Sequence, residues 1–222
     1  MDAGDPIGDV ELRGQRPNRG PATPPRLAAT VILLRGGART LEVLLVRRTP
    51  KARFMGGVWV FPGGAAERAD RDPRAQASAS EAGALRAAAV RELREEAGVE
   101  LARGAELVEL SRWITPREVQ IRFDTHFFLA TLPPGQEPRI DGEECVDLRW
   151  FTPQRALQAN REGEIELVFP TIRHLEQIAA FASADELLDH ARGREVHPVQ
   201  PRIALEGEVA HVLLPGDPGY EE

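Results

Sequence analysis

The sequence predicts an α/β sandwich built around a mixed β-sheet. Short β-like runs occupy the first third of the chain, one long helical segment follows, and further strands and helices come after it. Apolar residues make up 42% of the 222 residues, which is enough for one substantial core. Residues 1–26 differ, because five prolines and four glycines there predict an extended arm without a core of its own.

The predicted strands rest on apolar runs and on alternation along the chain. Residues 27–35 and 41–48 are two β-like runs around a Gly-Gly turn, which is typical of a hairpin. Pro62-Gly63-Gly64 ends a short strand at 58–61. Arg122, Asp124 and His126 alternate with apolar side chains in a later strand. The remaining predicted strands are 106–114, 119–131, 146–151 and a closing pair within 196–214.

The predicted helices have clear start and stop signals. Helix formers dominate 81–97, and Gly98 supplies a C-terminal stop. Val90, Leu93 and Ala97 fall within one narrow arc of that helix, so we expect them to face the core. The polar stretch 65–80 before it is predicted to be a loop. The other helices are predicted from Pro153 onward, over 170–182 and over 184–191.

Charge is unevenly distributed along the chain. Residues 11–60 carry ten basic side chains against two acidic ones, whereas 141–222 carry seventeen acidic against seven basic. The basic third suits a phosphorylated ligand, and the net charge of -7 disfavours nucleic acid. No apolar run approaches the ~20 residues of a membrane helix, so we expect no membrane partner. Cys145 is the single cysteine, which excludes an intrachain disulfide, and we expect a cytoplasmic protein.

An acidic helix face carries the strongest chemical signal. At about 100° per residue, Glu92, Glu95 and Glu96 lie on one face of the predicted helix. Three carboxylates this close repel one another unless a cation lies among them. Hard oxygen ligands of this kind suit Mg²⁺ or Mn²⁺. The alternative is a solvated acidic face with Arg91 and Arg94 as local partners.

The run from Arg91 to Val99, together with the upstream Pro62-Gly63-Gly64, resembles the Nudix box. The second half of that pattern, Arg-Glu-apolar-x-Glu-Glu-x-Gly-apolar, is matched at every position. The resemblance to Nudix hydrolases implies an α/β/α sandwich with a mixed β-sheet, which splits diphosphates linked to a nucleoside. It assigns residues 27–220 to a Nudix hydrolase domain, with 65–80 as an insertion within the box, and it favours a homodimer.

The resemblance also implies roles for individual residues. The Gly63 carbonyl, Glu92, Glu95 and Glu96 would hold Mg²⁺ or Mn²⁺, and Arg91 would orient Glu92. One of these glutamates, or Glu144 near a later strand, would take the proton from the attacking water.

The first half of the box departs from the family pattern. The pattern places thirteen residues between its first Gly and the Arg, whereas Gly64 and Arg91 enclose twenty-six. The acid that steadies Arg91 is therefore one of three candidates, Asp70, Glu67 and Glu81.

A second resemblance concerns the substrate. The segment 44–64 is similar to the signature upstream of the box in coenzyme A diphosphatases, although Val46 and Thr49 differ from it. Arg47, Arg48 and Arg53 in this segment supply forked donors suited to phosphate oxygens, and alternation places Arg47 and Arg48 on opposite faces. We add Arg122 as a further substrate-binding candidate. Residues 112–116, 122–130 and 214–220 resemble the Nudix branch with a lengthened box.

These resemblances lead to one preferred function and two alternatives. The preferred function is metal-dependent hydrolysis of coenzyme A or acyl-CoA to adenosine 3′,5′-bisphosphate and phosphopantetheine or its acyl form. The first alternative is an ADP-ribose or NADH diphosphatase. The second is a non-catalytic nucleotide sensor on the same fold, which the retained glutamates disfavour.

Overall fold

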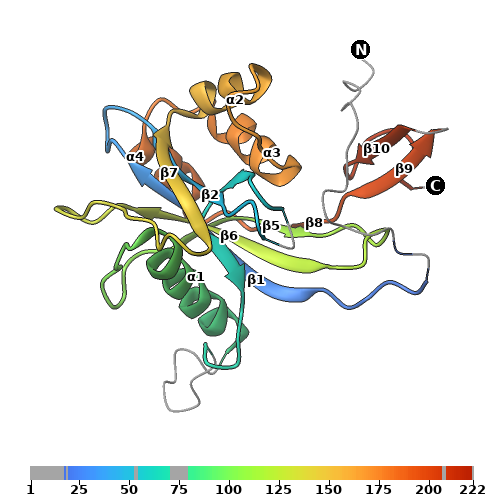
Figure 1. Ribbon diagram of the computed structural model, residues 1–222, viewed down its shortest axis with the longest axis horizontal. Coiled ribbons are helices and arrows are strands. Elements are labelled where there is room, and N and C mark those ends of the chain that lie inside the picture. Colours follow the sequence, from blue (N-terminus) through green and yellow to red (C-terminus); the bar gives the residue numbers. More distant parts are fainter. Residues whose placement is uncertain (1–17, 19, 53–54, 71–79, 207–208, 222) are drawn as a thin grey trace.

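The computed structural model describes residues 18, 20–52, 55–70, 80–206 and 209–221. In this part of the chain a mixed β-sheet lies between helices on both of its faces (Figure 1). Its strands are β1 (Arg26–Arg35), β2 (Glu42–Arg48), β3 (Trp59–Val60), β4 (Gly63–Ala65), β5 (Val108–Ile114), β6 (Phe123–Thr131), β7 (Cys145–Phe151) and β8 (Pro198–Val199).

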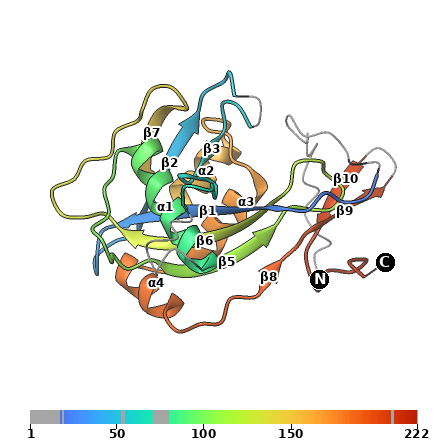
Figure 2. The same cartoon turned by 90° about the horizontal axis from the view of Figure 1, so that it is seen from below.

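The sheet is mixed, as predicted. Its strand order is β3-β2-β1-β6-β5-β8, with β4 paired to β1 and β7 paired to β2. The pairs β1–β6 and β5–β8 are parallel, and the other neighbours are antiparallel. A separate hairpin of β9 (Arg202–Glu206) and β10 (Val209–Leu213) follows β8 and lies at one end of the sheet (Figure 2).

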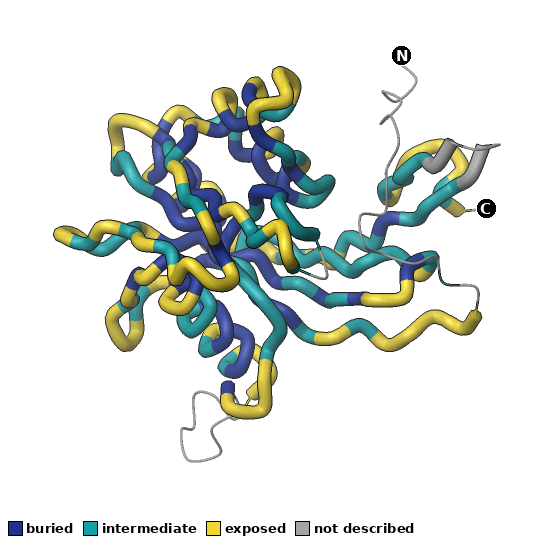
Figure 3. The backbone as a smooth tube through the Cα atoms, viewed as in Figure 1, coloured by how far each residue is buried: buried dark blue, intermediate teal, exposed yellow. Residues whose placement is uncertain are grey.

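Helices cover the sheet unequally. α1 (Glu81–Ala97) lies alone on one face, and α2 (Pro153–Arg161), α3 (Phe169–Ile178) and α4 (Ala184–Ala191) lie on the other (Figures 1 and 2). The side chains of β1 alternate between these layers, with Val31 and Leu33 on the α1 side and Ile32 and Leu34 on the other. All four are fully buried, as Figure 3 shows for the centre of the sheet. The predicted α/β/α sandwich is confirmed.

The glutamate-bearing helix has both of its predicted ends. Ser80 caps α1 by accepting a hydrogen bond from the Gly83 N–H, and Gly98 ends it in the left-handed conformation at φ 64°. Leu93 and Ala97 are fully buried, and Val90 packs at the margin of the same apolar cluster. Their burial fixes how the helix is rotated and therefore which side chains face away from the core.

Two predicted boundaries were wrong by four residues each. The strand expected from residue 119 begins at Phe123, because Phe123 and Thr115 exchange hydrogen bonds that close a turn before the strand starts. The helix expected over 170–182 ends at Ile178. Its continuation is interrupted because the Ala182 N–H bonds Glu186 and Ser183 caps α4.

The arm is described only at its end. Residues 1–17 and 19 lie outside the described residues, so the expectation for the 1–26 arm and the domain boundaries stays a prediction. Asn18 and Thr23 bond backbone groups of the 117–120 turn. None of the helices in the described ranges combines the length and apolarity that crossing a bilayer requires.

Candidate active site

The turn at Gly63-Gly64 brings β4 against the acidic face of α1. β4 pairs with β1 through Gly63 and Thr30, and α1 packs against both strands. A Cβ atom built on Gly64 would lie 2.3 Å from Oε1 of Glu92, and one on Gly63 would lie 2.5 Å from Oγ1 of Thr30. Backbone atoms of Ala29 and Thr30 therefore exclude a side chain at Gly63, whereas a side chain at Gly64 would displace the Glu92 carboxylate.

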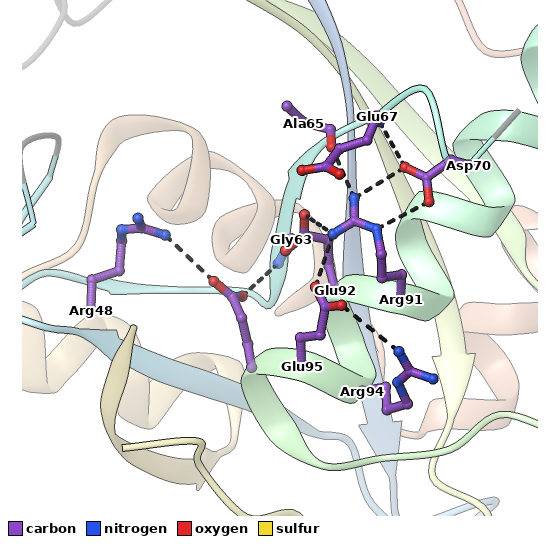
Figure 4. Close-up of polar contacts among 10 residues, drawn as sticks. Arg48, Gly63, Ala65, Glu67, Asp70, Arg91, Glu92, Arg94 and Glu95 are labelled. Carbon is purple, nitrogen blue, oxygen red and sulfur yellow. Dashed lines mark hydrogen bonds and ion pairs between the residues drawn. The ribbon is translucent and has the colours of Figure 1, made fainter. Parts of the chain in front are cut away.

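The three helix glutamates are buried to very different extents. Glu96 is 2% exposed, and its Oε2 accepts the Gly63 N–H at 2.9 Å. Glu92 is half-buried beside Gly64, whereas the Glu95 side chain is exposed. The group lies where α1 faces the β4 turn (Figure 4).

Arg91 connects these carboxylates to the turn. Its guanidinium donates to Glu92 at 2.8 Å and to Glu95 at 2.9 Å. It also donates to the Ala65 carbonyl at 3.0 Å. Two further bonds, at 3.0 and 3.1 Å, go to the carboxylate of Asp70 (Figure 4). Arg91 therefore links Glu92 to β4, and the orienting role that the resemblance implies for it stays a prediction.

Asp70 is the acid that pairs with Arg91 among the three candidates. It is 6% exposed, and its Oδ2 also accepts the backbone N–H of Glu67. The Glu67 side chain is exposed, and Glu81 lies in the first turn of α1. The hydrogen bonds that Arg91 donates to Asp70 are the largest cause of the raised pKa of Arg91, so this guanidinium stays charged.

The carboxylates at the turn are destabilised as anions. Burial raises the pKa of Glu96 to about 7, against the opposing effect of the Gly63 N–H. Burial also raises the pKa of Glu92, which Arg91 partly offsets. The charges of Glu92 and Glu144 add to the shift at Glu96. This is the electrostatic setting that a bound cation relieves.

The donor set fits a hard divalent cation, because it consists of clustered carboxylate oxygens beside a tight backbone turn. In the described residues, however, no group of three His, Cys, Asp or Glu side chains already converges as a ligand set. The reason is that Glu92 and Glu95 bond Arg91, and Glu96 bonds Gly63. Gly63 contributes its N–H here rather than the carbonyl expected from the sequence, and the four predicted metal ligands stay a prediction.

The structure separates the four arginines proposed for substrate binding. Arg48 faces the glutamates, with Nη1 3.5 Å from Oε1 of Glu96, and its buried Nε has no hydrogen-bond partner among the described residues. Arg47 points elsewhere and donates to the Gly57 carbonyl. Arg53 lies outside the described residues. Of the predicted arginines that the structure describes, Arg48 is therefore the one that lies beside the acidic cluster.

Arg122 occupies a different environment from the one expected. Its buried guanidinium donates to the carbonyls of Thr115 and Thr23, and burial lowers its pKa. These contacts hold the turn before β6 and the end of the arm. The alternation had placed His126 with Arg122, and His126 is also buried, bonded to Glu109 at 2.6 Å.

A long cleft of about 1640 Å³ begins at the glutamates. Asp141, Glu143 and Glu144 lie along the same end, so Glu144 shares the cleft with Glu92 and Glu96. Away from the glutamates, apolar side chains of β5, β6, α3 and the β9–β10 hairpin line the cleft, together with Arg173 and Glu176 of α3. Sequence reasoning missed this part, because only the folded chain brings Ile203 and Val212 to the same cleft as Trp113 and Phe127.

Comparisons with known proteins identify the family to which this fold and this glutamate cluster belong. The family described as the NUDIX domain matches residues 24–171. Acyl-coenzyme A diphosphatase NUDT19 of Homo sapiens is 36% identical over 119 residues, which is 50% of this chain and 31% of the relative. NUDT19 of Xenopus laevis is 32% identical over 124 residues, 52% of this chain and 32% of the relative. The match thus spans about a third of the length of these curated relatives.

A solved structure supports the fold directly. The crystal structure of a NUDIX hydrolase from Alicyclobacillus acidocaldarius is 30% identical to this chain with a TM-score of 0.65. The superposition covers 75% of this chain and 96% of that one.

Proposed function

Because the chain belongs to the Nudix family, we propose that it is a metal-dependent diphosphatase acting on coenzyme A or its acyl thioesters. The observation that carries the proposal is the burial of Glu96 and Glu92 against the Gly63-Gly64 turn, which raises the pKa of both carboxylates. The three helix carboxylates are held near this turn by hydrogen bonds with Arg91 and Gly63, which a bound cation would replace.

The proposed ligands are Glu92, Glu95, Glu96 and the Gly63 carbonyl. Bound Mg²⁺ or Mn²⁺ supplies two effects there, since it lowers the pKa of a coordinated water and neutralises charge on the diphosphate. Ligation requires the carboxylates to exchange their present hydrogen bonds for the cation. Arg91 itself stays anchored during that exchange, because the Asp70 carboxylate and the Ala65 carbonyl still hold its guanidinium.

The reaction is attack of water on one phosphorus of the diphosphate. A new P–O bond forms, the bridging P–O bond breaks, and a carboxylate takes the proton of the water. Glu92, Glu95 and Glu144 are the proposed proton acceptors. Among the predicted arginines that the structure describes, Arg48 is best placed to hold a phosphate oxygen, since it faces the glutamates and its Nε has no hydrogen-bond partner.

The substrate assignment rests on two supports. The segment 44–64 resembles the signature of coenzyme A diphosphatases, and the curated relatives are named acyl-coenzyme A diphosphatases. The expected products are adenosine 3′,5′-bisphosphate and phosphopantetheine, or its acyl form. A homodimer and a cytoplasmic location stay predictions, which light scattering and cell fractionation would check.

The test is a substrate panel with Mn²⁺. Purified protein is incubated with coenzyme A, 3′-dephospho-coenzyme A, ADP-ribose, NADH and dinucleoside polyphosphates, and products are identified by liquid chromatography with mass spectrometry. We expect the two products above, at a rate that depends on the 3′-phosphate. Equal rates with the dephospho form would favour the ADP-ribose or NADH alternative. Tight binding without turnover of any compound would favour the sensor.

A further inference from the structure

The cleft is larger and more varied than hydrolysis of a diphosphate requires. Its volume of about 1640 Å³ exceeds the roughly 300–1,000 Å³ of ordinary small-molecule sites. The glutamates occupy one end, so a substrate whose diphosphate lies there extends the rest of its length along the remaining cleft. The polarity of the side chains at the far end therefore indicates which chemical group the substrate carries beyond its diphosphate.

The far end is lined mainly by apolar side chains, although Arg173 and Glu176 of α3 also line the cleft. Trp113 of β5, Phe127 of β6 and Phe169 of α3 are its aromatic part, and Trp113 and Phe169 meet edge to face with their ring centroids 6.2 Å apart. Aromatic side chains of this kind offer few hydrogen bonds to a polar ligand, whereas covering them with hydrocarbon removes apolar surface from water and favours binding.

The β9–β10 hairpin completes this wall from outside the matched domain. Ile203 and Val212 are directly paired across the hairpin, so their side chains share one face, and both line the cleft. The neighbouring pair, Ala204 and His211, lies on the opposite face of the hairpin. The hairpin falls beyond residues 24–171, where the family match ends.

Contacts within the C-terminal segment brace the hairpin. The Tyr220 hydroxyl donates to the Gln200 carbonyl at 2.8 Å, and Arg202 donates to the Tyr220 carbonyl. The Leu214 N–H donates to Asp217 at 2.7 Å. These bonds join the hairpin to the residues on either side of it, and the preceding β8 pairs with β5, so the hairpin lies at that edge of the sheet (Figure 1).

We infer that the apolar end, closed by Ile203 and Val212, binds the acyl chain of a thioester substrate and so selects acylated over free coenzyme A. This inference rests on the proposed function and names the part of the chain that decides the substrate form. Continuity with the glutamate end identifies the occupant, since a linear acyl-phosphopantetheine arm starts at the diphosphate and ends in hydrocarbon.

The kinetic test compares decanoyl-coenzyme A with free coenzyme A. We expect the wild-type kcat/KM to be at least about tenfold higher for the decanoyl form, given that each buried methylene contributes up to about fourfold. Val212→Ser should reduce that preference about fivefold and leave turnover of free coenzyme A unchanged. Val212→Ile should retain the preference. Ala204→Ser, a matched serine on the opposite face, should have no effect.

A binding test separates this inference from the proposed function. Calorimetry without metal measures the affinity for S-decanoyl-4′-phosphopantetheine, and circular dichroism verifies that each variant is folded. If coenzyme A is hydrolysed but neither preference nor affinity depends on Val212, the inference is overturned and the diphosphatase stands. If nothing is hydrolysed but the affinity depends on Val212, the function fails and the apolar site stands. A Val212→Ser effect confined to oligomeric state would mean that a second copy covers this face, which also overturns the inference.

Discussion

Replacing Asp70 by Asn breaks the ion pair that holds the Arg91 side chain of α1 beside the β4 turn. The Asp70 side chain is 4% exposed and makes two hydrogen bonds to Arg91, of which an amide can accept only one. Removing one partner of a buried ion pair costs about 3–5 kcal/mol. Arg91 keeps Glu92, Glu95 and the Ala65 carbonyl, so we expect the lower figure of about 2–3 kcal/mol for Asp70→Asn.

The assays are thermal unfolding and turnover. A loss of this size lowers the melting temperature by about 5–10 °C in a chain of this length. Turnover should fall about 10–100-fold, the range typical for partners that orient metal ligands, because Arg91 no longer positions Glu92. Glu67→Gln is the matched control, since that side chain is exposed and Glu67 contacts Asp70 through its backbone N–H. Equal effects of Asp70→Asn and Glu67→Gln, or wild-type behaviour of both, would refute the reasoning.

Three further predictions follow from single contacts. Gly64→Ala places a Cβ atom 2.3 Å from Oε1 of Glu92 and must displace that carboxylate, so we expect turnover to fall more than about tenfold in a folded protein; unchanged kinetics would contradict this close approach. Arg48→Met should raise KM for coenzyme A about tenfold, whereas Arg47→Met should not, because only Arg48 faces Glu96; equal KM values for the two variants would remove Arg48 from the site. His174 is fully buried and its pKa is lowered to about 4, so only the unfolded chain binds its proton between about pH 6.5 and 4. The unfolding free energy should therefore decrease by up to about 3 kcal/mol as the pH is lowered from about 6.5 to 4. Urea titrations of His174→Phe should show a pH-dependent decrease that is smaller by this amount.

Local signals were sufficient to predict the glutamate-bearing helix α1. Ser80 and Gly98 bound α1 by capping contacts within a few residues, and the helical period alone places the three glutamates on one face. The strands around it were predicted by apolar runs, because burial on both sides of the sheet requires nearly continuous hydrophobic side chains.

Long-range contacts account for what the sequence did not decide. Asp70 reaches Arg91 across an insertion whose path no local pattern specifies, so three acids were equivalent candidates. Arg122 was a substrate-binding candidate, but β6 starts at Phe123 and the Arg122 guanidinium bonds two distant carbonyls. The apolar end of the cleft depends on a hairpin about ninety residues downstream of β5, a proximity that only the tertiary fold creates.

The most direct test of a metal-dependent diphosphatase is the response of Glu95→Gln and Glu96→Gln to Mn²⁺. Each substitution removes one charged oxygen at nearly constant volume, so the circular dichroism spectrum should stay that of the wild type. Turnover should fall by orders of magnitude, and the rise in melting temperature on adding Mn²⁺ should shrink, because a ligand stabilises only the state that binds it. Near-wild-type turnover in both variants, with the Mn²⁺-induced shift intact, would contradict the assignment of this helix to the metal.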